Sequence, residues 1–184
     1  MRHRIVAACA FAVVAVQPAI SADALAATTY RVGPGQSLAT PSNVPWESLA
    51  AGDSVLIFWR AAPYKDKWVL NRAGTEVAPI VVRGIPDPSS GALPVIDGQD
   101  AVTRAQLNSW GENRGVIKIG GSNTPPDGMP SWIVIEDLEI RNGHTPYTFT
   151  GRAGLTAYAG NAAAIYCERG QHVTIRGCKL TARS

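Results

Sequence analysis

One sequence pattern occurs twice in the last third of this chain. The stretches WIVIEDLEIRNG (132–143) and HVTIRGCKLTAR (172–183) align without a gap, 40 residues apart. The aligned apolar pairs are Ile133 with Val173, Ile135 with Ile175, Leu138 with Cys178, and Ile140 with Leu180. Apolar residues at alternate positions are typical of a β-strand. The pair between them, Glu136-Asp137 or Arg176-Gly177, indicates a bend, so each copy predicts two strands joined by a bend.

A further short strand is predicted before each copy, in GVIKIGG (115–121) and AAIYCERG (163–170). Repeats of this length predict a solenoid, because one coil of chain can bury its apolar face only by stacking on the next coil. The segments between strands, such as 122–130 and 144–161, differ in length. Loops of unequal length at the corners of a fixed coil fit this architecture.

Two other β architectures fit the sequence less well. An antiparallel sandwich favours Asp-Gly or Asn-Gly turns between paired strands. Such dipeptides occur at 97–98, 127–128 and 142–143, but none lies directly between two alternating stretches. A βαβ sheet needs long helices between its strands, whereas the connecting segments here are rich in Gly and Pro. The pattern therefore favours the solenoid.

The first half of the chain adds further strands and a short helix. Compact apolar stretches predict strands at 54–59, 67–70, 79–84 and 94–98. Residues 44–51 carry helix signals, with Pro45 in the first turn and Gly52 just after the end. We expect this helix to cover the N-terminal end of the core.

The first 26 residues have the pattern of a secretory signal peptide. Arg2 and Arg4 give a basic start, residues 5–16 are apolar, and ALA (24–26) offers small residues for cleavage, with a cut after Ala22 as the alternative. The apolar run is too short to span a bilayer. We therefore expect a secreted or periplasmic protein whose folded domain is 27–184 and which keeps no membrane span.

Charge and cysteine content narrow the range of partners. Without residues 1–26 the formal charge falls from +3 to +2, and the charges are scattered, which argues against nucleic acid. Cys167 and Cys178 could form a disulfide in an oxidising compartment, or remain as two buried thiols at core-facing positions. No C-x-x-C spacing is present, so no metal site is expected.

These repeats, together with the opening YRVGPGQSLATPSNVPWESLAAGDSVLI (30–57) and the stretch GTEVAPIVVRG (74–84), resemble the right-handed parallel β-helix proteins of the pectin-lyase-like superfamily. The resemblance covers nearly all of residues 28–184. It implies an all-β fold, a right-handed parallel β-helix with a short N-terminal capping helix. The superfamily includes polysaccharide lyases, glycoside hydrolases, epimerases and tailspikes, so the resemblance does not choose a reaction.

The resemblance implies an exported protein that acts on or binds polysaccharide. An enzyme would be a lyase or hydrolase of an acidic glycan, with Ca²⁺ as cofactor in the lyase case and no cofactor otherwise evident. The alternative is a non-catalytic surface, adhesion or scaffold solenoid, or an inactive fragment of a larger protein. Because the final strand pattern has no cover, we expect a chain truncated at its C-terminus. Catalytic residues would then lie on later coils, and none is assigned here.

Five residues are candidates for substrate contact: Tyr147, Arg152, Tyr158, Glu136 and Arg176. The first three lie in the long segment 144–161, where aromatic rings could stack on sugars or fold over the coil. The 40-residue offset places Glu136 beside Arg176, and such neighbours either form ion pairs on a solvated face or line a groove for an anionic sugar chain. His172 shares its repeat position with Trp132, which favours packing over catalysis.

Overall fold

The computed structural model describes residues 26–181. Within them, regular structure consists of strands and three short 3₁₀ turns, so the expected all-β class is confirmed. The signal-peptide prediction falls, except for residue 26, outside the described residues. The strands are β1 (Thr29–Val32), β2 (Ser54–Phe58), β3 (Asp66–Leu70), β4 (Ile80–Ile85), β5 (Val95–Asp97), β6 (Ala101–Thr103), β7 (Asn108–Ser109), β8 (Gly115–Ile119), β9 (Ser122–Thr124), β10 (Ser131–Glu136), β11 (Glu139–Arg141), β12 (Thr148–Gly151), β13 (Gly154–Ala157), β14 (Ala163–Cys167), β15 (Gln171–Arg176) and β16 (Lys179–Leu180).

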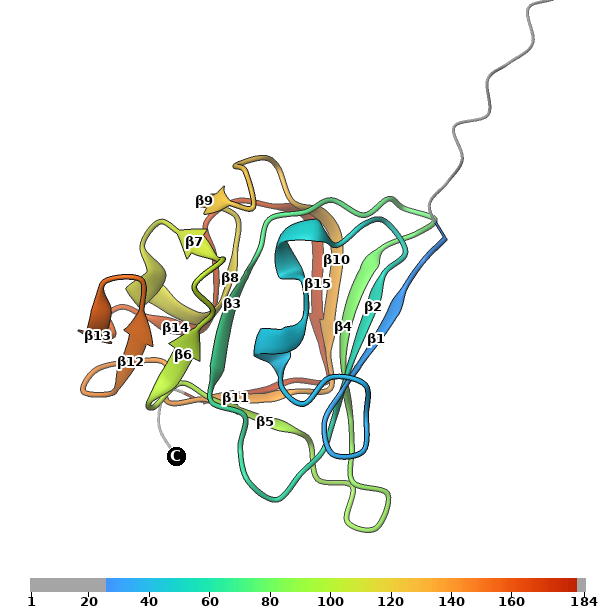
Figure 1. The fold of residues 1–184 in the computed structure, drawn as a ribbon, viewed down its shortest axis with the longest axis horizontal. Helices are drawn as coiled ribbons and strands as arrows, with labels where there is room; N and C mark the ends of the chain where they lie inside the picture. Colours follow the sequence, from blue (N-terminus) through green and yellow to red (C-terminus); the bar gives the residue numbers. More distant parts are fainter. Residues whose placement is uncertain (1–25, 182–184) are drawn as a thin grey trace, which may run out of the picture.

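Most strands pair in parallel and form three faces. The first face has the order β1-β2-β4-β10-β15, the second has β5-β11-β16, and the third contains β3-β8-β14. The chain visits these faces in one order, from β4 to β5 to β8 and then from β10 to β11 to β14. Figure 1 shows the three faces around a common interior. We call one such passage a coil.

The register between coils confirms the 40-residue repeat. Ile133 lies opposite Val173, Ile135 opposite Ile175, and Ile140 opposite Leu180. The rows of inward side chains are buried in the middle coils, where Ile135 and Ile140 are 0% exposed. On the last described coil Ile175 is 42% exposed and Leu180 is 46% exposed. A side chain in these rows is thus covered by its own coil and by the coils on both sides.

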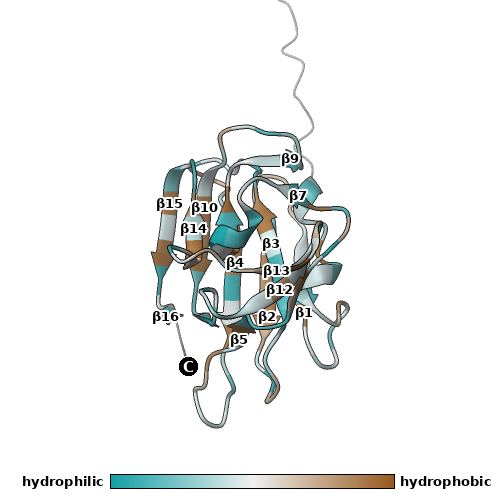
Figure 2. Cartoon of the chain, turned by 90° about the vertical axis from the view of Figure 1, so that its left-hand side faces the viewer, coloured by the Kyte–Doolittle hydropathy of each residue, from teal (hydrophilic) through white to brown (hydrophobic). Residues whose placement is uncertain are grey.

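The core is apolar and lies within the coils. Figure 2 shows hydrophobic residues in strands such as β3. The fully buried large side chains come from all three faces, the N-terminal turns, the hairpin and connecting segments: Trp46, Tyr64, Phe149, Leu49, Ile57, Leu70, Ile80, Ile96, Leu107, Ile117, Ile119 and Ile133. Burial of this apolar surface is the main stabilising contribution to such a fold.

The bend between the first and second faces is a short left-handed turn. Asp137 has φ of 57° and Gly177, at the equivalent position, has φ of 62°. Glycine adopts this conformation without strain, and Asp tolerates it better than most other residues. The polar pair predicted to break each copy into two strands therefore coincides with a backbone turn of the required type.

The helix predicted at 44–51 is wrong. In its place the chain forms two 3₁₀ turns, η1 (Pro41–Asn43) and η2 (Trp46–Ser48), with Pro45 between them. Packing explains the difference, because the Trp46 ring is fully buried, stacks on Trp68 at 4.7 Å and donates a hydrogen bond from Nε1 to the Pro41 carbonyl. Figure 1 shows both turns lying across the end of the coil, where the helix was expected.

Segment 144–161, predicted as a corner loop, contains a β-hairpin. Strands β12 and β13 pair antiparallel, with Gly151 opposite Gly154 at the turn. β12 also pairs in parallel with β6, which continues the third face beyond β3. Figure 1 shows this hairpin on the opposite side of the molecule from β4 and β10. The insertion thus extends one face without changing the stacking of the coils.

Gly84 tests the close contact between coils. A Cβ atom at Gly84 would lie 1.9 Å from the Asp137 carbonyl oxygen, which is backbone and cannot move aside cheaply. We predict that Gly84→Ala lowers the free energy of unfolding by at least about 2 kcal/mol, measured by urea denaturation. Gly128→Ala is the matched control, since a Cβ there meets no atom within 4 Å and the side chain would be exposed. Equal denaturation midpoints for the two variants would contradict the coil contact.

Candidate functional site

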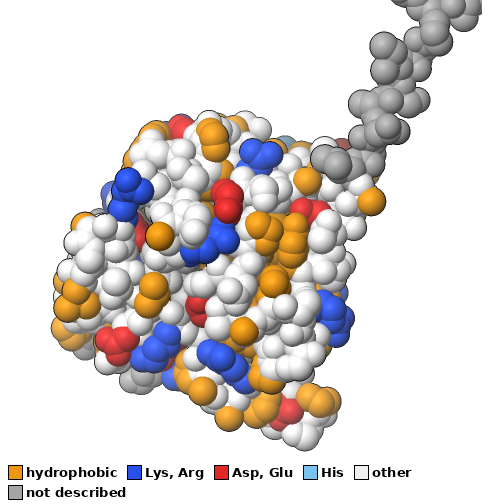
Figure 3. Space-filling model, viewed as in Figure 1, with side chains coloured by type: hydrophobic (Ala, Val, Ile, Leu, Met, Phe, Trp, Pro, Cys, Tyr) orange, Lys and Arg blue, Asp and Glu red, His pale blue; other side chains and the backbone are white. Residues whose placement is uncertain are grey.

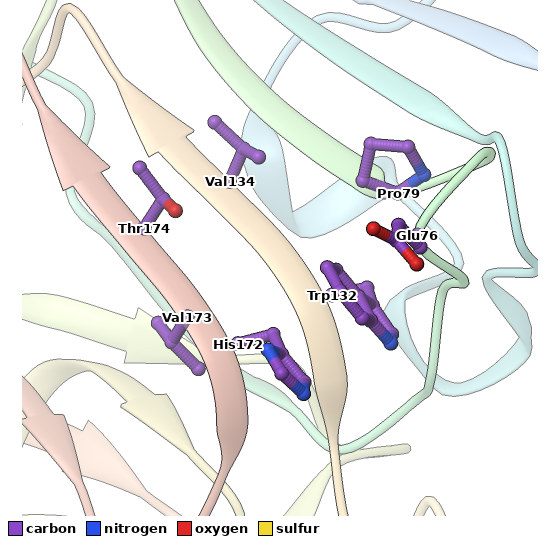
Figure 4. A pocket seen from close by; sticks show the side chains of 7 residues that line it. All are labelled: Glu76, Pro79, Trp132, Val134, His172, Val173 and Thr174. Atoms are coloured by element: carbon purple, nitrogen blue, oxygen red, sulfur yellow. The ribbon is translucent and has the colours of Figure 1, made fainter.

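A pocket opens on the outer surface of the first face. Its volume is about 320 Å³, at the lower end of the range for small-molecule sites. It is lined by Glu76, Pro79, Trp132, Val134, His172, Val173 and Thr174. Figure 4 shows that these residues come from the starts of β10 and β15 and from the segment leading into β4. The pocket therefore spans three successive coils.

Trp132 and His172 form a stack between two coils. Their ring centroids are 3.9 Å apart and the rings are within 5° of parallel. Each residue has a left-handed backbone, with φ of 52° at Trp132 and 51° at His172. A left-handed conformation is unfavourable for such side chains and is kept only where the surrounding structure holds it. Here the parallel pairing of Ser131 with Gln171, immediately before the two rings, holds both turns in register.

Glu76 supplies the carboxylate of the pocket. It lies in the turn closed by mutual backbone hydrogen bonds between Thr75 and Ala78, at 3.0 and 3.1 Å. Its side chain is exposed and forms no ion pair with any described residue. Figure 4 shows Glu76 on the side of the Trp132 ring away from His172. The pocket thus joins an aromatic face to a solvent-accessible carboxylate.

Farther along the same strands, Glu136 is held between two arginines. Arg83 and Arg176 contact it from the coils on either side, with Arg176 Nε at 2.5 Å from Oε2. The Glu136 side chain is only 4% exposed, whereas those of Arg83 and Arg176 are 46% and 63% exposed. Burial by itself raises the pKa of the Glu136 carboxyl, but hydrogen bonds and charges from Arg176 and Arg83 outweigh it, so the net pKa lies below its usual value.

The neighbours expected from the 40-residue offset, Glu136 and Arg176, form an ion pair. Glu139 pairs with Lys179, also 40 residues away, at 3.1 Å. Glu136 lies four residues after Trp132 on the same outer side of β10, so about 13 Å of strand separates the arginines from the aromatic stack. Val134 and Thr174 lie between them. We call this strip, from Glu76 to Arg176, the outer strip.

The structure separates the five candidate contact residues. Glu136 and Arg176 lie on the outer strip, whereas Tyr147, Arg152 and Tyr158 belong to the hairpin segment beside the third face. Tyr147 is half-buried, and Arg152 is exposed at the hairpin turn, where its N–H donates to Glu112 Oε2 at 3.3 Å. Tyr158 is 3% exposed and donates a hydrogen bond to the Gly98 carbonyl, so its ring folds over the coil, which was one of the two arrangements expected for this segment.

A buried lysine holds this hairpin segment. Lys67 is 3% exposed, and its Nζ lies 4.1 Å from the Phe149 ring centroid and 4.4 Å from that of Tyr158. Nζ also donates to the carbonyls of Glu112 and Gly115. Burial lowers the pKa of Lys67 from its ordinary value of 10.5 to about 7, with the Glu112 carboxylate opposing the change. The alternating pattern of β3 does not predict that Lys67 is buried, because the segment that covers it is an insertion.

The two described cysteines are free thiols, so the possible disulfide is not formed. Cys167 is exposed and Cys178 is half-buried, so neither is the buried core-facing thiol that was the alternative expectation. Partial burial raises the pKa of both thiols. Among residues 26–181, no three His, Cys, Asp or Glu side chains gather in a way that could hold a metal ion. Within the same range, no helix has the length and apolarity needed to cross a membrane.

None of the seven residues that line the pocket was among the sequence candidates for substrate contact, and three of them, Glu76, Trp132 and His172, supply its chemistry. The shared repeat position of Trp132 and His172 was visible in the sequence and indicates their stacking. Glu76 has no counterpart in the repeat and gives no comparable signal. The aromatic face of the pocket can stack against a ligand ring, and its carboxylate can accept a hydrogen bond from a ligand donor. The described residues of its lining include one carboxylate, whereas glycoside hydrolysis ordinarily uses two across a cleft.

Comparison with protein-family models, curated proteins and solved structures finds no match to this chain.

Glu136 offers a test of the charge network. Glu136→Gln removes the shared carboxylate and leaves two arginines without their partner, so we predict a loss of about 1–2 kcal/mol of unfolding free energy at neutral pH. A carboxyl with a lowered folded pKa stabilises above its unfolded pKa, and this contribution disappears as pH falls through the folded pKa. The difference between variant and wild type should therefore shrink in acid. Glu76→Gln, which removes an unpaired carboxylate, should match the wild type throughout; a pH-independent deficit in Glu136→Gln would contradict the assignment.

The lowered pKa of Lys67 predicts a second pH dependence of stability, of the same sign but at higher pH than that of Glu136. Between its folded pKa of about 7 and its unfolded value of 10.5, the unfolded chain holds more protons than the folded one. Stability contributed by this group should therefore rise as pH increases from about 7 to about 9. Chemical denaturation across that range should show the rise in the wild type and in Lys65→Met, an exposed neighbour, but not in Lys67→Met. The same rise in Lys67→Met would show that another group causes it.

Proposed function

We propose that this chain folds as a right-handed parallel β-helix in an exported protein and that it binds polysaccharide on the outer strip. Three parallel faces visited in one order support the β-helix. The basic start and apolar run of residues 1–16 support export to the periplasm or the exterior. The observation that carries the binding function is the pocket formed by the Trp132–His172 stack and Glu76.

The physical basis is that a pyranose ring has an apolar C–H face and a rim of hydroxyl donors. An exposed aromatic face can bury the apolar C–H face of the sugar, and a carboxylate can accept hydrogen bonds from its hydroxyl groups. The outer strip extends about 13 Å beyond the aromatic stack to the arginines, which gives room for more than one sugar unit. A polymer can therefore contact the strip at successive positions.

Binding, and not cleavage, is the function that the described residues support. Glu76 is the one carboxylate among the described residues that line the pocket, and Glu136 is engaged by two arginines. The distribution of charge also argues against a surface that binds polyanions such as nucleic acid through their backbone charge alone. Figure 3 shows acidic and basic side chains dispersed over one face of the molecule, with no large patch of one sign.

Affinity electrophoresis through gels that contain neutral, acidic or amino polysaccharides tests the proposal. We predict that the wild type is retarded by at least one of them and that Trp132→Ala weakens its binding about tenfold. Trp110→Ala is the matched control, because Trp110 is 39% exposed and does not line the pocket. Absence of retardation in every gel, or equal loss in both variants with unchanged thermal midpoints, would overturn the proposal.

A further inference from the structure

The space in the pocket arises from a row of three rings of unequal size. Ile80, Ile133 and Val173 lie opposite one another on successive coils, so the residues immediately before them, Pro79, Trp132 and His172, occupy one row. His172 covers one face of the Trp132 ring. The neighbour on the other side is the much smaller proline. The row therefore leaves the second indole face open beside Pro79, where Glu76 lies (Figure 4).

One acidic side chain lies in the lining of this opening. Among the described residues of the lining, the Glu76 carboxylate is the acidic group, His172 is the titratable base, and there is neither Lys nor Arg. The nearest arginines of the outer strip, Arg83 and Arg176, lie at the far ends of their strands, about 13 Å away, and share Glu136. A ligand group placed against the open indole face thus meets a carboxylate and an aromatic ring with a negative face. Both attract a cation and repel an anion.

We infer that this pocket selects an amino sugar with a protonated amine, and not a uronate. The inference rests on the proposed function, and it names the sugar class that the pocket accepts. The pyranose face would pack on Trp132 while its ammonium donates a charge-assisted hydrogen bond to Glu76. This outcome departs from the acidic glycan that the sequence suggested, since a uronate carboxylate in the pocket would face Glu76 directly.

Titration of tryptophan fluorescence with three matched trimers tests the inference. The ligands are glucosamine, N-acetylglucosamine and galacturonate trimers, at about pH 6, where a primary amine of this class is protonated. We expect the glucosamine trimer to bind at least about tenfold more tightly than the acetylated trimer, because acetylation removes the positive charge. The galacturonate trimer should bind more weakly still. Added salt should reduce the preference.

Two single-residue variants test whether the preference for the amine depends on the Glu76 carboxylate. Glu76→Gln should lower affinity for the glucosamine trimer about tenfold and leave the acetylated trimer nearly unchanged. Glu139→Gln removes a carboxylate from the second face and should alter neither affinity. Equal binding of the amine and acetylated trimers, tighter binding of galacturonate, or no effect of Glu76→Gln would overturn the amino-sugar inference while the polysaccharide proposal stands. Failure of all three trimers, together with no retardation in any polysaccharide gel, would overturn both.

Discussion

The stacking of one coil on the next is the constraint on which the rest of this structure depends. Inward residues such as Val82 and Ile135 are fully buried because coils on both sides cover them. The same parallel hydrogen bonding also aligns the outward residues. Trp132 therefore lies against His172, and Glu136 lies between Arg83 and Arg176. Core and outer strip are consequences of a single register, so a change that shifts one coil would disturb both.

The sequence predicted the later coils well because their spacing is constant. The 40-residue offset between Ile133 and Val173 reappears as direct strand pairing. A constant offset does not describe the preceding coil, because Ile133 pairs with Ile80 and Ile140 pairs with Ile96. These two pairs have different separations in the sequence. Corner segments of different length intervene, and they alter sequence spacing without altering the position of the strands.

Side chains were predicted where the repeat determines their neighbours. The Glu136–Arg176 pair and the shared position of Trp132 and His172 follow from alignment alone. Tyr158 and Lys67 do not, because their burial depends on how an inserted hairpin folds over the third face. The expected helix at 44–51 failed for a related reason: local helix signals were outweighed by burial of the Trp46 ring against Trp68.

Parallel strands also give the outer strip a direction. Every strand of the first face begins at the same edge, so Glu76 lies at one end of the strip and the paired arginines at the other. The two ends consequently differ in electrostatic potential. A linear molecule with a positive and a negative group spaced along its length has one favourable orientation on such a surface, and its reversal would bring like charges together at both ends.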